Sequence, residues 1–354
     1  MADQDPYCRI GLNGPYRFAL ICIWVLALSL ARPTGALSAI TLEDMAGRAV
    51  TISKPVHRLV TTFKPATLCV LSLGLGDKLV GVDTSSKQDR LHLAVHPPIA
   101  DTIAVGNKRM GLSYETVIAL APDLVILFAQ KDGIALSQRL EQVGIPSLII
   151  LPEDFSTIKS ALNLIARAVG EPQRTRPAFN AMDDILSFVD QRIGAIGPDE
   201  RRTGYFASSI GLFSTTTRNM LQDKMFERAG IRNVSHDLEG YFQDISPEQF
   251  MAWNPDLVVL SQHLNKNTIK RLSSPALKRV SAIRDKQVFR CPSDLSPWDF
   301  PSPLSVLGVL WMAQKAYPEK FSDVDILRMA DRFHKTLFGK SMSGMGGTLH
   351  DNLD

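Results

Sequence analysis

One sixteen-residue stretch occurs twice in the chain and constrains its fold more than any other feature. The sequence SYETVIALAPDLVILF at residues 113–128 returns as SPEQFMAWNPDLVVLS at residues 246–261, and eight of the sixteen positions are identical without a gap. The two copies are offset by 133 residues, which is too far for the units of a solenoid and indicates duplicated domains.

Both copies predict the same local structure. Ser113 and Ser246 can cap a helix by accepting a hydrogen bond from a backbone N–H of its first turn. Glu115 and Glu248 then lie in that first turn, where the helix dipole favours negative charge. A proline about two turns later ends each helix, and the apolar runs DLVILF and DLVVLS are typical of buried strands. A helix that leads into a buried strand, at both places, predicts two similar α/β lobes.

The rest of the chain alternates strands with helices and predicts a mostly parallel, doubly wound sheet in each lobe. We assign residues 39–171 to an N-terminal α/β lobe and residues 197–338 to a C-terminal one. Residues 172–196 between them predict one long helix that acts as a stiff connector, because apolar residues recur at helical spacing: Phe179, Met182, Ile185, Leu186, Val189 and Ile193. Residues 339–354 lack apolar periodicity and are predicted to be a disordered tail.

Residues 1–38 have the order of a secretory signal peptide, with Arg9 and Arg17 before an apolar run and small residues after it. The apolar run at residues 18–31 is shorter than the ~20 residues that span a bilayer. The alternative is an uncleaved N-terminal anchor. Cys22 follows Ile21, which makes a poor lipoprotein cleavage site, so we expect an exported protein without a lipid anchor.

Composition argues against nucleic acid as a partner and leaves open whether the cysteines are free thiols or form a disulfide. The net charge of +3 and the lack of a dense Lys/Arg run argue against a nucleic-acid surface. Cys69 and Cys291 both fall in apolar segments and are expected to be buried thiols. A disulfide between them is the alternative in an exported protein.

Patterns of catalytic and metal-binding residues are scarce. The sequence contains no G-x-S-x-G, H-E-x-x-H or Walker motif. His92 and His96 have helical i, i+4 spacing, but their segment is polar and lacks a third ligand nearby, so a solvated pair is the expected reading. Two other hypotheses stay open: an exported enzyme on the same scaffold, and a divalent-metal receptor that uses His57, His92, His96 or His263.

Loops that follow the predicted strands are the candidate ligand site, because open α/β sheets bind ligands at the carboxyl ends of their strands. Aromatic rings there suit a bulky, partly apolar ligand, and lysines suit an anionic one such as a ferric chelate or a metal oxyanion. The alternative is that Phe63 and Trp298 belong to the core and that the lysines are solvated. The candidate residues are Thr62, Phe63, Lys64, Gln130, Lys131, Ser208, Ser209, His263, Trp298, Asp299 and Phe300.

The chain resembles the class III substrate-binding proteins of ABC importers, which capture iron–siderophores, haem, cobalamin and some metal oxyanions. The similarity runs from Arg58 to about Phe321 and is carried by RLVTTFKPATLCVLSLGLGDKLVGVD, by ALAPDLVIL and AWNPDLVVL, and by PWDFPSPLSVLGVLWMAQKAYPEKF. The resemblance implies two Rossmann-like lobes joined by one long rigid helix, with a ligand cleft between the lobes. It implies a periplasmic protein that is not an enzyme and needs no cofactor.

The resemblance also implies a partner. In the family, one glutamate on each lobe docks onto the permease dimer in the inner membrane, and the matching positions are Glu115 and Glu248. Helix electrostatics alone is the alternative explanation of these two residues. We expect a monomer that captures an iron chelate or a related metal complex, with a metal oxyanion or a bare divalent metal ion as alternative ligands.

Overall fold

The computed structural model describes residues 39–107, 111–129, 133–351 and 353. The predicted signal peptide at residues 1–38 lies outside these residues, and residues 39–354 form one compact unit. No helix among the described residues has the length and apolar character needed to cross a membrane.

The N-terminal part is built on a five-stranded sheet with the order β5-β4-β3-β8-β9. Every neighbouring pair in it is parallel, as predicted. The strands are β3 (Leu59–Thr61), β4 (Leu79–Val82), β5 (Ile103–Ala104), β8 (Leu124–Phe128) and β9 (Ser147–Ile150). The helices of this part are α2 (Lys64–Ser72), α3 (Thr84–Lys87), α4 (Arg90–Val95), α5 (Tyr114–Ala119), α6 (Gly133–Glu141) and α7 (Phe155–Ala168).

Both faces of this sheet are covered by apolar side chains. Leu59 and Leu124 belong to the core cluster that includes α2 and α7. Val60 and Val125, the next residues along the same strands, belong to a second cluster with side chains from α5 and α6. Because successive strand residues point to opposite faces, burial on both sides explains why these strands read as continuous apolar runs.

The C-terminal part contains a second sheet with the order β13-β11-β10-β14-β15, in which β12 also pairs with β10. Strands β10, β12, β14 and β15 are parallel, and β11 is antiparallel to β10. The strands are β10 (Thr203–Ala207), β11 (Ser214–Thr215), β12 (Arg232–Asn233), β13 (Gln243–Asp244), β14 (Leu257–Leu260) and β15 (Val288–Arg290). The helices are α9 (Leu221–Arg228), α10 (Pro247–Trp253), α11 (Lys266–Ile269) and α12 (Ser281–Arg284).

The repeated stretch makes the same contacts in both sheets. Asp123 N donates to Arg58 O at 2.8 Å, and Asp256 N donates to Thr203 O at 3.0 Å. The side chains match as well, because Asp123 Oδ2 accepts from Arg58 N at 2.9 Å and Asp256 Oδ2 accepts from Thr203 N at 2.7 Å. Each aspartate therefore joins the start of its own strand to the start of the neighbouring parallel strand. The predicted duplication of an α/β lobe is confirmed.

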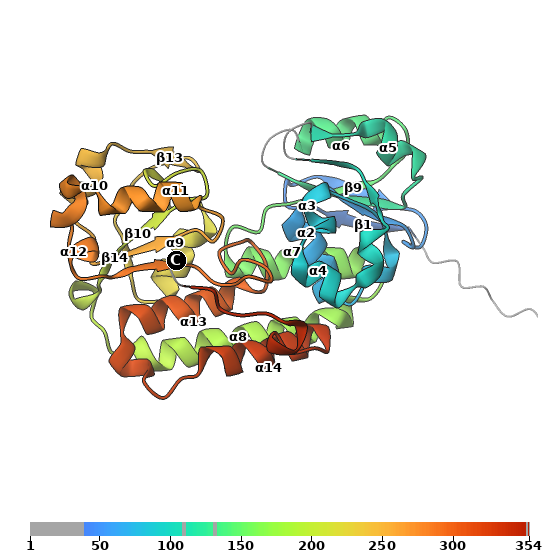
Figure 1. The fold of residues 1–354 in the computed structure, drawn as a ribbon. Helices are drawn as coiled ribbons and strands as arrows, with labels where there is room; N and C mark the ends of the chain where they lie inside the picture. Colours follow the sequence, from blue (N-terminus) through green and yellow to red (C-terminus); the bar gives the residue numbers. More distant parts are fainter. Residues whose placement is uncertain (1–38, 108–110, 130–132, 352, 354) are drawn as a thin grey trace, which may run out of the picture. The chain divides into compact units, whose positions relative to one another are not determined.

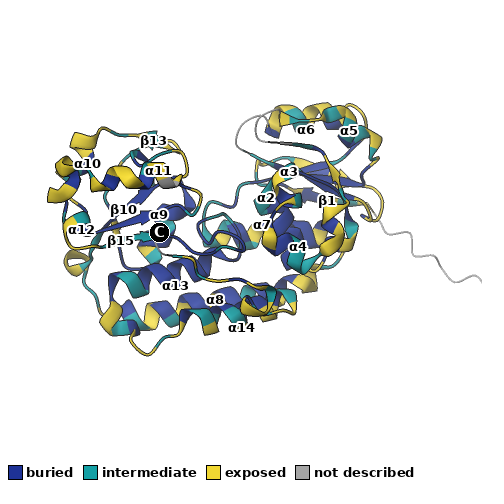
Figure 2. Cartoon of the chain, viewed as in Figure 1, coloured by how far each residue is buried: buried dark blue, intermediate teal, exposed yellow. Residues whose placement is uncertain are grey.

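Three longer helices pack together in the remaining part of the fold (Figure 1). They are α8 (Thr175–Ile193), α13 (Ser305–Ala316) and α14 (Ile326–Phe338). The apolar stripe of α8 is buried at Met182, Ile185, Leu186 and Val189, and α13 is buried along almost its whole length (Figure 2). Helix α8 lies between the two sheets in the sequence, and its role as a stiff connector stays a prediction.

Shorter elements complete the fold. Two antiparallel ribbons are formed by β1 (Ile40–Glu43) with β2 (Ala49–Ile52) and by β6 (Gly106–Asn107) with β7 (Gly111–Leu112). The 3-10 helices are η1 (Gly76–Lys78), η2 (Pro97–Ala100), η3 (Pro172–Arg174), η4 (Pro198–Glu200), η5 (Lys270–Ser273), η6 (Pro275–Arg279), η7 (Pro318–Phe321) and η8 (Ser343–Met345).

The C-terminal tail differs from the prediction. Of residues 339–354, those that the structure describes pack against the fold, so the prediction of a disordered tail is wrong for them. Met342 is fully buried, and Trp311 Nε1 donates to Asp351 Oδ2 at 2.9 Å. Lys315 forms an ion pair with the same carboxylate at 3.0 Å. The buried Met342 side chain and the polar contacts of Asp351 therefore attach this segment to the fold, although it has no apolar periodicity.

Candidate functional site

The first group of candidate residues follows β3. Thr62 is half-buried, and its hydroxyl donates to Ile126 O at 3.2 Å. Phe63 is the N-cap residue of α2, and its ring lies 4.6 Å from the ring of Phe128, which ends β8. Lys64 begins α2. The carboxyl ends of the neighbouring strands β3 and β8 therefore present a pair of aromatic rings beside an amine.

Lys64 is balanced by a carboxylate that sequence analysis did not identify. Lys64 Nζ lies 3.0 Å from Asp89 Oδ2, and the two side chains are only 14% and 2% exposed. Asp89 is also the N-cap of α4, where its Oδ1 accepts from Leu91 N and His92 N. Because the pair is largely desolvated, the Lys64 charge is tied to this carboxylate and is not a freely solvated cation.

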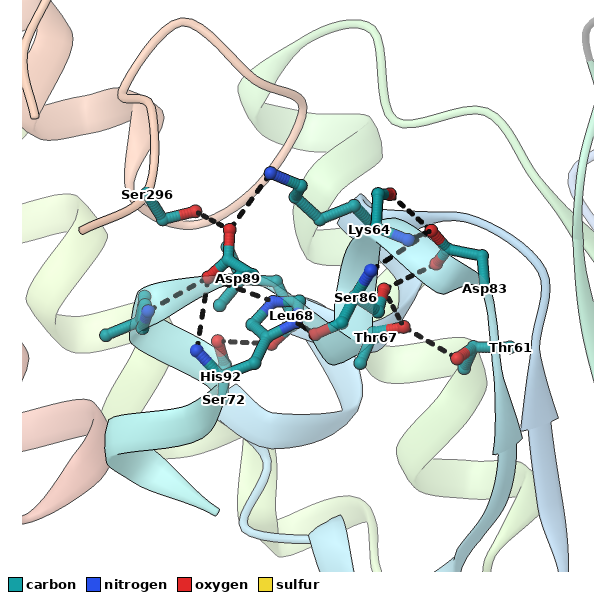
Figure 3. A network of polar contacts seen from close by, with 12 residues as sticks. Thr61, Lys64, Thr67, Leu68, Ser72, Asp83, Ser86, Asp89, His92 and Ser296 are labelled. Carbon is teal, nitrogen blue, oxygen red and sulfur yellow. Dashed lines mark hydrogen bonds and ion pairs between the residues drawn. The ribbon is translucent and has the colours of Figure 1, made fainter. Parts of the chain in front are cut away.

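A buried polar network extends behind this ion pair (Figure 3). Thr61 and Thr67 share a hydrogen bond of 2.6 Å, and Ser86 Oγ donates to Thr67 Oγ1 at 2.9 Å. The Ser86 hydroxyl also bonds to Asp83, which caps α3. These contacts link the ends of β3 and β4 to the first turns of α2 and α3, so the backbone around Lys64 is held from several sides.

His92 lies inside this network, and the prediction of a solvated His92–His96 pair is therefore wrong. The His92 ring is fully buried, its Nδ1 lies 3.1 Å from Ser86 O, and burial lowers its pKa although the nearby Asp89 carboxylate raises it. His96 is half-buried, 3.8 Å from Asp77. Within the described ranges, no three His, Cys, Asp or Glu side chains gather as a metal-ligand set.

The second group of candidate residues follows the strands of the C-terminal sheet. Ser208, directly after β10, is buried, and its hydroxyl accepts from Ile210 N at 3.2 Å. Ser209 is exposed. His263 follows β14 and is exposed. Two of these three side chains are thus on the surface near the carboxyl ends of β10 and β14.

The loop after β15 contains residues of different kinds. Trp298 is fully buried, in agreement with the core alternative, and Phe300 is half-buried. Asp299 is also buried, and its Oδ2 accepts from Ser261 Oγ at 2.6 Å. Burial raises the pKa of Asp299 to about 6, although the hydrogen bond from Ser261 lowers it. Asp299 therefore joins this loop to the end of β14.

Phe300 brings the two groups of residues together. Its ring lies 5.4 Å from the His263 ring in an edge-to-face arrangement, and Lys64 Nζ lies 5.5 Å from the ring centroid. Lys64 comes after β3 of the N-terminal sheet, and His263 comes after β14 of the C-terminal sheet. The same loop makes a further contact with the N-terminal part, because Ser296 Oγ donates to Asp89 Oδ2 at 3.4 Å (Figure 3).

Two of the candidate residues, Gln130 and Lys131, lie outside the described residues. Sequence analysis missed Phe128 and Asp89, although each carried a signal: Phe128 ends a predicted strand, and Asp89 precedes a run with helical spacing.

The thiols of Cys69 and Cys291 are both buried and free, in agreement with the prediction of buried small hydrophobic residues.

Glu115 and Glu248 occupy equivalent places on the surface. Both are exposed and lie in the first turn of their helices, α5 and α10. The caps are equivalent too, since the Ser113 and Ser246 hydroxyls accept from Thr116 N at 3.4 Å and from Gln249 N at 3.1 Å. Among the described residues, neither glutamate forms an ion pair.

Comparison with known proteins finds similarity to a molybdate-binding protein in both sequence and fold. The chain is 24% identical over 323 residues to the molybdate-binding protein MolA of Haemophilus influenzae, covering 85% of this chain and 91% of the relative. The solved structure of that protein bound to molybdate has a TM-score of 0.74 at 22% identity and covers 85% of this chain and 98% of its own.

Other relatives have different ligands. A vitamin B12-binding protein of Vibrio parahaemolyticus is 22% identical over 242 residues, covering 68% of this chain and 83% of the relative. The structure of CeuE from Helicobacter pylori in complex with Ni-His has a TM-score of 0.75 at 20% identity and covers 87% of this chain and 98% of its own. The periplasmic binding protein family model matches residues 59–295, and the chain therefore belongs to the periplasmic binding proteins of ABC transporters.

Proposed function

We propose that this protein is an exported, periplasmic receptor that captures an iron chelate or a related metal complex and delivers it to an ABC permease. The observation that carries the proposal is the position of Phe300, whose ring lies beside both Lys64 and His263. Residues that follow the carboxyl ends of strands in two separate sheets thus meet at one aromatic ring. Ligands bind at such strand ends in open α/β sheets.

The chemistry of these residues favours a bulky ligand with apolar surface. The rings of Phe63, Phe128 and Phe300 supply apolar and aromatic contact area. Lys64 supplies a positive charge, but Asp89 already balances it. A chelate that spreads a small negative charge over a large partly apolar surface fits such a site better than a small, highly charged anion does.

A metal oxyanion is the second candidate ligand. The similarity to a molybdate-binding protein over 85% of this chain favours it. Such an anion would need several hydrogen-bond donors, and the described candidate residues that carry one at least partly outside the core include Lys64, Ser209 and His263. A bare divalent cation has less support, since the described part of the chain contains no ligand set for it.

A ligand screen with matched variants tests the proposal. The chain from Ala39 onward would be screened by thermal shift, and by calorimetry for each hit, against ferric siderophores, haem, cobalamin, molybdate and divalent metal ions. A bound ligand raises the Tm by mass action. We expect a ferric chelate to give the largest shift, and Phe300→Leu to weaken that binding at least tenfold.

The control is Phe338→Leu, which removes the same atoms from another half-buried ring and should leave the affinity unchanged. A shift with molybdate alone would support the second candidate instead. Ligand binding that tolerates both substitutions equally would contradict a site at Phe300.

We further infer that the protein acts as a monomer and docks on the permease dimer through Glu115 and Glu248. Their equivalent exposed positions in the two copies of the repeat support this role, because a two-fold partner requires two equivalent contacts. Neither glutamate is among the candidate ligand residues, so docking and ligand capture should be separable by substitution.

A further inference from the structure

A hollow of 510 Å³ lies beside the N-terminus of α10, the helix that carries Glu248. It is lined by the loop after β12, by the end of β13 and by α10 itself. Its lining includes Ser246 and Gln249, the residues two before and one after Glu248. The hollow therefore adjoins the proposed docking contact along α10, and none of the candidate ligand residues lines it.

The lining combines an apolar base with a polar margin. Its half-buried members Val234, Leu238, Ile245 and Trp253 are apolar. Asp237 and Asp244 also line it, and both are exposed. The centroid of the Trp253 ring lies 6.3 Å from that of the buried Tyr205 ring, so Trp253 packs on the core of this lobe. The lining thus contains one aromatic ring, three aliphatic side chains and two exposed carboxylates.

The charges around the hollow are negative and unbalanced. Among the described residues, the carboxylates of Asp237 and Asp244 take part in no ion pair and no hydrogen bond. Arg218 reaches this loop, but it donates to the backbone carbonyl Asp237 O at 3.3 Å and forms its ion pair with Glu239 at 3.1 Å. Asp237, Asp244 and Glu248 therefore leave a local excess of negative charge beside an apolar base.

We propose that this hollow receives one arginine side chain of the permease, next to the contact made by Glu248. The aliphatic stem of an arginine would lie on the apolar base, and its guanidinium would stack on Trp253, which is the best aromatic partner for a cation. Asp237 and Asp244 would accept its hydrogen bonds. The inference rests on the proposed docking function, and it adds a second contact at the C-terminal part of the chain.

Direct binding is tested with N-acetyl-arginine amide as the probe and its neutral analogue N-acetyl-citrulline amide as the control. In the chain from Ala39 onward, which lacks Trp24, tryptophan fluorescence reports on the hollow, because Trp298 and Trp311 are fully buried while Trp253 is half-buried. We expect saturation by the arginine probe in the millimolar range, at least tenfold weaker binding in Asp237→Asn/Asp244→Asn, and no saturation by citrulline. Equal responses to the two probes would overturn the proposal.

Docking in the cell is tested with a benzophenone side chain at position 252. Ala252 is exposed on α10 and does not line the hollow. We expect cross-linking to the transmembrane permease subunit, at least fivefold weaker in Asp237→Asn/Asp244→Asn. The control Asp199→Asn/Glu319→Gln removes two exposed charges elsewhere in the C-terminal part and should leave the yield unchanged.

The outcomes separate the two proposals. If Glu115→Lys/Glu248→Lys abolishes cross-linking but Asp237→Asn/Asp244→Asn does not reduce it, the hollow is no contact while the docking role of the glutamates stands. If cross-linking to the permease survives in Glu115→Lys/Glu248→Lys, the docking role fails. Cross-linking to a second copy of this chain would contradict both proposals.

Discussion

Lys64 and Phe300 are 236 positions apart in the sequence, yet Lys64 Nζ lies 5.5 Å from the centroid of the Phe300 ring. Lys64 begins the helix after β3, and Phe300 lies in the loop after β15. The same loop bonds to Asp89 through Ser296. A cation, its counterion and an aromatic ring are therefore held together by segments that belong to different sheets. At this point the proposed ligand contact and the stability of the protein depend on the same residues.

The first prediction concerns this ion pair. Lys64→Met should lower the free energy of unfolding by about 2 kcal/mol, because Asp89 would be left largely buried without its cation. The two backbone hydrogen bonds from Leu91 and His92 should keep the loss below that of a fully orphaned carboxylate. Urea unfolding measures the change. In Lys64→Met/Asp89→Asn the loss should be partly recovered, and an unchanged single variant would contradict the pairing.

The second prediction concerns His334, which is fully buried with Nδ1 2.8 Å from Ala330 O. Burial lowers its pKa from 6.5 to about 4. Between pH 6.5 and pH 4 the His334 ring is protonated in the unfolded chain but stays neutral in the folded protein. The stability linked to His334 is therefore complete above pH 6.5 and is lost as pH falls toward 4. The loss amounts to about 3 kcal/mol. His334→Asn should remove that part of the pH dependence in urea unfolding at pH 7 and pH 4.5, and an unchanged slope would count against it.

Asp299 should act in the opposite direction, which is the third prediction. Its pKa is raised from 3.8 to about 6, chiefly by burial. Between pH 3.8 and pH 6 the Asp299 carboxyl is therefore protonated in the folded protein and ionised in the unfolded chain. The stability linked to Asp299 is complete below pH 3.8 and is lost as pH rises through 6, by about 3 kcal/mol. Relative to the wild-type protein, Asp299→Asn should be most favourable at pH 7 and less favourable at pH 4.5. The same urea series measures the difference, and a difference independent of pH would contradict a raised pKa.

The elements of the repeat could be predicted from sequence because their signals are local. The apolar runs at 124–127 and 257–260, which are rich in valine, isoleucine and leucine, are fully buried, and Ser113 and Ser246 cap their helices as expected. The left-handed backbone conformation at the turn before each strand could not be predicted from sequence in the same way. Ala121 and Asn254 both have a φ of 43°, although alanine has no preference for the left-handed region. The position is fixed by the turn that the strand pairing requires, and so depends on the tertiary structure.

The candidate site was predictable only in part, for a related reason. Strand ends mark where loops begin, so Phe63, Lys64 and Phe300 could be found. What surrounds a side chain depends on residues far along the chain. His92 looked solvated because its neighbours are polar, but those neighbours form a buried network that closes over it. Trp298 looked like a ligand contact because its loop is rich in aromatic and proline residues, and it is fully buried.

The fourth prediction concerns the C-terminal tail. Met342→Ala should lower the free energy of unfolding by roughly 2–5 kcal/mol, because it removes a fully buried side chain. Met342→Leu keeps the volume and should cost less than about 1.5 kcal/mol. Chemical denaturation of the two variants measures the difference. A tail that contributes nothing to the fold would make the two substitutions equally harmless.

The fifth prediction separates docking from ligand capture. Glu115 and Glu248 are exposed and without an ion pair among the described residues, so reversing both charges in Glu115→Lys/Glu248→Lys should leave ligand affinity in solution unchanged. The fold should lose no more than the helix-dipole contribution, typically 0.3–1 kcal/mol at each helix. Uptake of the same ligand by cells that carry only the variant should be abolished, because two repulsive contacts replace two attractive ones. Each single reversal should retain part of the uptake. Normal uptake by the double variant would contradict a docking role, whereas loss of ligand affinity would show that the glutamates act on the binding site itself.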